Sequence, residues 1–166
     1  MGITFREAAA EVELGLVSGD QLPDIAMSGL LEGYGSPSLE GLAARFGEPF
    51  DAVEVERLWT AALEELGLSL DTPTAAARIL VRGYARLVAE GELPPQLGAS
   101  KIAGVHRVAG HHSCDAHEPG DCIGAATVMK LFYSHDGRGY FDQSRHGRVD
   151  IAIVEECRRL AELPAN

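Results

Sequence analysis

The sequence has no hydrophobic run that approaches the roughly 18 residues a membrane-spanning helix needs. Its first residues, MGITFREAAAEVELGL, are acidic where a secretory signal peptide has a basic start and an apolar stretch. Arg6 stands where an N-myristoylation signal has serine or threonine. We therefore predict no membrane association and a cytoplasmic location.

The sequence also lacks the short motifs of common enzyme classes. It has no GxGxxG or GxxxxGK[ST] nucleotide loop, no GxSxG elbow and no HExxH zinc motif. The stretch HDGRGYFDQ contains Asp136 and Asp142 but not the alternating acids and final glutamate of a calcium loop. These absences favour a binding protein over an enzyme, and no catalytic residue is predicted.

Basic residues are scarce in the first part of the chain. Residues 1–70 contain 13 acidic and three basic residues, whereas residues 71–166 contain 12 and 11, and the net charge is −11. Nucleic acid binding depends on lysine and arginine at phosphates, so a nucleic acid partner is not expected. The acidic half has two interpretations, a surface that keeps the protein soluble and a surface that steers a basic partner.

Helix-capping patterns recur along the chain, and no segment alternates with period two over the length of a strand. Thr4 and Glu7 match a capping box, and Asp51 with Glu54 is an acidic variant of it. Further helix starts are expected at Ser36-Pro37, Thr72-Pro73, after Pro23, near Pro95, at Asp121 and near Val149. The sequence therefore predicts an all-α protein of about seven or eight helices, with residues 1–166 in a single helical domain.

Residues 111–122, HHSCDAHEPGDC, concentrate the side chains that transition metals prefer. The candidate zinc ligands are His111, His112, Cys114, His117 and Cys122. Two other interpretations stay open. Cys114 and Cys122 would close a disulfide loop in an oxidising compartment, or the segment is a solvated polar loop. Apart from this zinc hypothesis, no cofactor is expected.

Two groups of residues are candidates for contact with a protein partner. Four glutamates lie on the helix expected after Asp51, namely Glu54, Glu56, Glu64 and Glu65. Arg138 and Tyr140 lie in a glycine-rich stretch, and arginine and tyrosine are enriched where interfaces bind most strongly. Cys157 falls on the apolar face of the last predicted helix, so we expect a small buried side chain there.

The segment from about Ser36 to Ala103 contains LWTAALEELGL, a helix that opens at Pro73, and then ARLVAEGELPPQLGASKI. In these features it resembles small acidic helical proteins of high-GC bacteria, which are largely uncharacterised. Some bacterial immunity proteins, which neutralise toxins, are similar in size, acidity and helical content. The resemblance implies a helical protein that binds another protein, and it transfers no catalytic residue.

Three functional hypotheses follow from the sequence. The first is an acidic helical protein that binds and occludes a basic protein partner, as an immunity protein or antitoxin does. The second is a zinc-binding protein or metal-dependent enzyme that uses residues 111–122. The third is a structural subunit that buries an apolar helix face in an oligomer.

Overall fold

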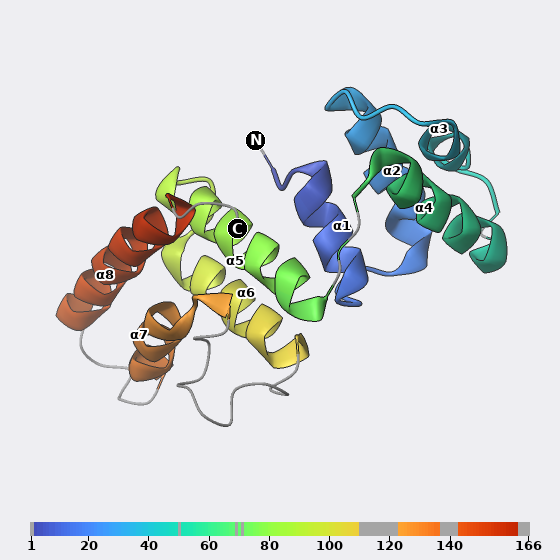
Figure 1. The fold of residues 1–166 in the computed structure, drawn as a ribbon. Helices are drawn as coiled ribbons and strands as arrows, with labels where there is room; N and C mark the ends of the chain where they lie inside the picture. Colours follow the sequence, from blue (N-terminus) through green and yellow to red (C-terminus); the bar gives the residue numbers. More distant parts are fainter. Residues whose placement is uncertain are drawn as a thin grey trace. The chain divides into compact units, whose positions relative to one another are not determined.

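The computed structural model describes residues 2–49, 51–68, 70, 72–109, 123–136 and 143–162. These residues form eight α-helices and one short 3₁₀ helix, with no strand among them (Figure 1). The prediction of an all-α fold with seven or eight helices is therefore confirmed. Within the described ranges, no helix is both long enough and apolar enough to cross a membrane.

The helices gather into two compact units. One unit is Thr4–Asp71, and the other is Met1–Ile3 together with Thr72–Asn166. We refer to them as the N-terminal unit and the C-terminal unit. The prediction of a single domain over residues 1–166 stays a prediction.

The N-terminal unit contains four α-helices whose ends are set by local sequence. They are α1 (Phe5–Glu13), α2 (Leu22–Leu31), α3 (Pro37–Ala43) and α4 (Ala52–Leu66), with the 3₁₀ helix η1 (Gly19–Gln21) before α2. The capping box before α1 is confirmed: the Thr4 hydroxyl accepts from the Glu7 N–H, and the Glu7 carboxylate accepts from the Thr4 N–H. Asp51 caps α4, which ends at Gly67 in the left-handed conformation.

Phe5 lies at the centre of the core of the N-terminal unit and is 1% exposed. Its ring centroid lies 4.9 Å from that of Tyr34 and 5.9 Å from that of Trp59. Gly29 makes this packing fit, because a Cβ at that position would lie 2.6 Å from a ring carbon of Phe5. The ring of Phe5 therefore joins α1, α2 and α4 in one apolar cluster.

One position on α2 differs from what the sequence pattern predicts. The pattern places Ile25, Leu30 and Leu31 inward; Ile25 and Leu30 do pack against the core, whereas the side chain of Leu31 is 85% exposed. The fully buried positions of α2 include Leu22, Ala26 and Gly29, and the glycine turns inward to admit the Phe5 ring. A residue two positions after Gly29 lies about 200° around the helix, so Leu31 faces solvent.

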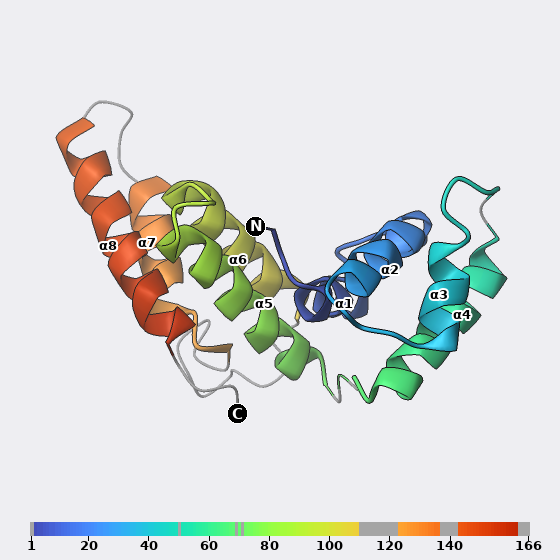
Figure 2. The same cartoon turned by 90° about the horizontal axis from the view of Figure 1, so that it is seen from above.

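In the C-terminal unit α5 packs against both α6 and α8, and α7 packs against α6 and α8 (Figure 2). The helices are α5 (Pro73–Ala89), α6 (Pro95–Val108), α7 (Ala126–Asp136) and α8 (Gln143–Ala161). Gly98 permits the close approach of α6 to α5, because a Cβ there would clash with Val88. Cys157 on α8 is fully buried as predicted, and burial, followed by the charge of Glu156, raises the pKa of its thiol to about 11.

Two helix starts in the C-terminal unit differ from the sequence prediction. The last helix is expected from Val149 but begins at Gln143, six residues earlier. Gly147 lies within it, although a glycine costs a helix about 1 kcal/mol relative to alanine. Packing of α8 on α5 offsets that cost. The helix expected directly after Asp121 begins at Ala126 instead.

Candidate functional site

The predicted metal ligands and two of the predicted partner residues lie outside the described residues. They are His111, His112, Cys114, His117 and Cys122, with Arg138 and Tyr140. In the remaining, described part of the chain, no group of three or more histidine, cysteine or acidic side chains is placed to hold a metal ion. Zinc binding by residues 111–122 thus stays a prediction.

Two of the four candidate glutamates on α4 have partners within the N-terminal unit. The carboxylate of Glu54 accepts two hydrogen bonds of 3.0 Å from Arg57 and one of 3.5 Å from Arg45. The hydrogen bonds from Arg57 contribute most to lowering the pKa of Glu54. Glu54 therefore links α4 to Arg45, which lies two residues after the end of α3.

Glu65 holds the first turn of α3. Its carboxylate accepts from the Ser38 N–H at 3.0 Å and from the Ser38 hydroxyl at 2.7 Å. The bond from the Ser38 N–H is the largest cause of the lowered pKa of Glu65, followed by the hydroxyls of Ser38 and Ser36. An anion at a helix N-terminus is stabilising, so this glutamate has a clear role inside the fold.

The other two candidates, Glu56 and Glu64, are exposed on α4. Eight residues separate them, which corresponds to about 12 Å along the axis and about 80° around it. The four glutamates are thus distributed around α4 and do not gather on one face. Their role in partner binding stays a prediction.

Replacing Glu65 with glutamine is expected to lower the stability of the N-terminal unit at neutral pH. The folded-state pKa of Glu65 lies below its ordinary value of 4.5, so its contribution is present above that value. The contribution is lost as the pH falls through the lowered folded-state pKa. Thermal denaturation at a series of pH values checks this: wild type and variant should differ at pH 7 and converge in acid. A difference that is independent of pH would contradict this role.

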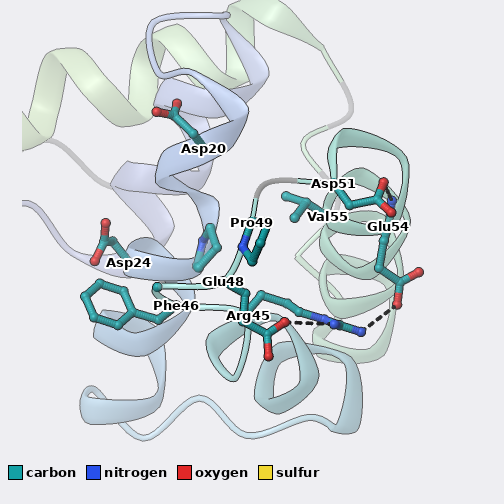
Figure 3. A pocket seen from close by; sticks show the side chains of 11 residues that line it. Asp20, Asp24, Arg45, Phe46, Glu48, Pro49, Asp51, Glu54 and Val55 are labelled. Atoms are coloured by element: carbon teal, nitrogen blue, oxygen red, sulfur yellow. Dashed lines mark hydrogen bonds and ion pairs between the residues drawn. The ribbon is translucent and has the colours of Figure 1, made fainter.

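A pocket lies wholly within the N-terminal unit (Figure 3). Its volume is about 400 Å³. The start of α2, the connection from α3 to α4 and the first turn of α4 form its walls. The lining residues are Asp20, Pro23, Asp24, Arg45, Phe46, Gly47, Glu48, Pro49, Asp51, Glu54 and Val55.

Negative charge dominates this pocket, since five carboxylates line it and Arg45 is its one basic residue. Arg45 donates to Glu48 at 2.9 Å, and its other terminal nitrogen lies 3.5 Å from Glu54 (Figure 3). The hydrogen bond to Glu48 is the main cause of the raised pKa of Arg45. The lining residues together carry a formal charge of −4.

The acidic side chains of the pocket differ in whether they already accept hydrogen bonds or form ion pairs. Asp51 accepts from the N–H groups of Val53 and Glu54, and Asp20 accepts from the hydroxyl of Ser18. The carboxylate of Asp24 has no hydrogen-bond or ion-pair partner among the residues that the structure describes. Asp24 is therefore the pocket carboxylate most available to an incoming cation.

Apolar surface lies beside these charges. Phe46 is 60% exposed and points to the same side of the pocket as Asp24, while Val55 is buried (Figure 3). Carboxylates next to apolar walls suit a lysine or arginine side chain, because such a side chain has an apolar stem and a charged end. The pocket has the composition of a site for a basic side chain.

Sequence reasoning identified Glu54 and Asp51 but missed the pocket around them. Asp20 and Asp24 lie 21 to 28 residues before Arg45 and Glu48 in the sequence, and only the fold of the unit joins them. The one local signal is RFGEPF, residues 45–50, in which an aromatic residue is followed by a glycine and a proline between two predicted helices. Comparison with protein-family models, curated proteins and solved structures gave no match to this chain.

Proposed function

We propose that this protein binds a basic protein partner through its N-terminal unit and occludes a functional surface of that partner. The observation that carries the proposal is the acidic pocket, with five carboxylates against one arginine. The unit around it supports the same conclusion. Residues 4–71 contain 14 acidic and three basic residues, a net charge of −11 that equals the charge of the whole chain.

In this proposal, the negative charge of the N-terminal unit attracts the partner during its approach. The pocket then binds the partner once the two proteins are in contact. A single-sign field raises the rate of encounter with an oppositely charged protein. A lysine or arginine of the partner then enters beside Asp24, with its stem against Phe46. Inhibition by covering a surface of the partner requires no catalytic step by this protein. It is also what the resemblance to immunity proteins implies, with the cytoplasm as the proposed location.

The proposal is tested with two variants of equal charge. The pocket variant carries Asp20→Asn, Asp24→Asn and Glu48→Gln. The control carries Glu13→Gln, Glu40→Gln and Glu155→Gln, which are exposed glutamates outside the pocket lining and outside the candidate partner residues on α4. Both lose three negative charges, so they differ only in where the charge is removed.

Each full-length variant, and the wild type, is used to capture proteins from cell extract for quantitative mass spectrometry. We expect a basic partner whose recovery falls about tenfold or more with the pocket variant and by about twofold or less with the control. Purified partner and protein should then reproduce the difference. Equal recovery by the wild type and the pocket variant, or captured partners that are not basic, would contradict the proposal.

A further inference from the structure

An exposed line of side chains on α2 continues from the pocket. Asp24 lines the pocket, and Met27 and Leu31 follow it at spacings of three and four residues, so all three lie on one face of α2. Met27 is 41% exposed and Leu31 is 85% exposed. The line is about 10 Å long, which corresponds to two helical turns.

Phe46 adds apolar surface at the pocket end of this line. It lines the pocket with Asp24, and Figure 3 shows both side chains on the same side of it. A carboxylate is thus flanked by exposed apolar side chains, with Phe46 on one side and Met27 and Leu31 along α2. Met27 and Leu31 are neighbours on one face of α2, and exposed apolar residues that neighbour one another are typical of a surface that binds a partner.

We infer that the pocket and this exposed face of α2 together bind an amphipathic, basic helix of the partner protein. The inference rests on the proposed function and specifies the partner's chemistry. The charge of −4 on the pocket lining selects a basic side chain. The apolar residues that follow, spaced over two turns, complement apolar residues at i and i+3 or i+4 of a facing helix.

The contributions of the pocket carboxylates and of the apolar residues Met27 and Leu31 to affinity are expected to respond differently to salt. Charge attraction between exposed groups weakens as ionic strength rises, because the Debye length shortens from about 10 Å at 0.1 M to about 3 Å at 1 M. Burial of apolar side chains is not screened in this way. Substitutions of Met27 and Leu31 should therefore lower affinity at every salt concentration, whereas substitutions of the pocket carboxylates, Asp24 among them, should matter most at low salt.

The probe is a synthetic, fluorescently labelled helical peptide of roughly 18 residues, with leucines on one face and arginines beside them. Its control has the same composition in a scrambled order that destroys the apolar face. Binding to the full chain is measured by fluorescence anisotropy at about 0.05 M and about 0.5 M NaCl. The test variant is Met27→Ser/Leu31→Ser. The matched control is Leu97→Ser/Ile151→Ser, which removes two exposed apolar residues from the C-terminal unit.

We expect the Met27→Ser/Leu31→Ser variant to bind the amphipathic peptide about tenfold more weakly at both salt concentrations. The Leu97→Ser/Ile151→Ser variant should stay within about twofold of wild type, and the scrambled peptide should bind about tenfold more weakly than the amphipathic one. These serine substitutions are at exposed positions, so circular dichroism should show unchanged helix content.

Equal binding of the two peptides, no binding of either, or no effect of Met27→Ser/Leu31→Ser would overturn the helix inference. The proposed function fails separately, through the capture experiment with the pocket variant. If peptide binding depends on Asp24 but not on Met27 and Leu31, the result would support binding of a basic side chain in the pocket and would rule out a helix bound along α2. If the pocket variant fails to capture the partner, and Met27→Ser/Leu31→Ser fails to bind the peptide, the results support both the proposed function and the helix inference.

Discussion

Replacing Phe5 with alanine is expected to unfold much of the N-terminal unit under conditions in which the wild type is folded. Phe5 is 1% exposed and packs between Tyr34, Trp59 and the backbone at Gly29. Truncating a buried phenylalanine to alanine costs about 3–5 kcal/mol, because the cavity closes only in part. A unit of this size has a total stability of about 3–10 kcal/mol, so this loss is a large fraction of it.

The chain provides its own reporter for this effect. Its one tryptophan, Trp59, lies in the same core and is 6% exposed. Denaturant titration followed by tryptophan fluorescence therefore reports on the N-terminal unit. Phe46→Ala is the matched control, since Phe46 is 60% exposed and its truncation should change stability by less than about 1 kcal/mol. Similar midpoints for Phe5→Ala and wild type would contradict the assignment of Phe5 to the centre of this core.

Replacing Arg45 with glutamine is expected to strengthen binding of a basic partner, about tenfold at low salt. Arg45 is the one cation in the pocket lining, and it lies 2.9 Å from Glu48 and 3.5 Å from Glu54. Its removal frees Glu48 and changes the formal charge of the lining residues from −4 to −5. Glu54 keeps its two hydrogen bonds from Arg57, so the start of α4 should be preserved.

This gain is measured with the labelled basic peptide at about 0.05 M NaCl and should largely disappear near 1 M, where charges are screened. Arg6→Gln is the matched control, because Arg6 is an exposed base of the same unit that does not line the pocket. It makes the same change in net charge and should alter affinity by about twofold or less. Equal gains in the two variants would show that overall charge, and not the pocket, governs binding.

The starts of α1, α3 and α4 were predictable because capping is a local interaction, whereas α2 has no side-chain cap and begins at Leu22, before the predicted start after Pro23. The hydroxyls of Thr4 and Ser36 and the carboxylate of Asp51 each accept from an N–H two or three residues further along the chain. Such contacts are visible as short sequence patterns. The left-handed Gly67 at the end of α4 was predictable for the same reason.

The features that sequence did not show depend on contacts between distant residues. The inward position of Gly29 depends on a phenylalanine 24 residues earlier, and the exposure of Leu31 follows from it. The pocket joins Asp24 to Arg45 and Glu48, which no local pattern relates. The acidity of the N-terminal half was evident from the sequence. The place where carboxylates surround a pocket could be found only from the fold.

In the proposed function, the acidic pocket of the N-terminal unit holds a basic side chain of a partner protein. This binding is tested most directly by the salt dependence of partner or peptide affinity in wild type and in the Asp24→Asn single variant. Asp24 lines the pocket and is exposed, so its replacement should leave the fold intact. We predict an affinity about fivefold to tenfold lower for the variant at low salt, with a shallower decline as salt is added. Two curves that coincide at every salt concentration would contradict binding of a basic side chain in the pocket.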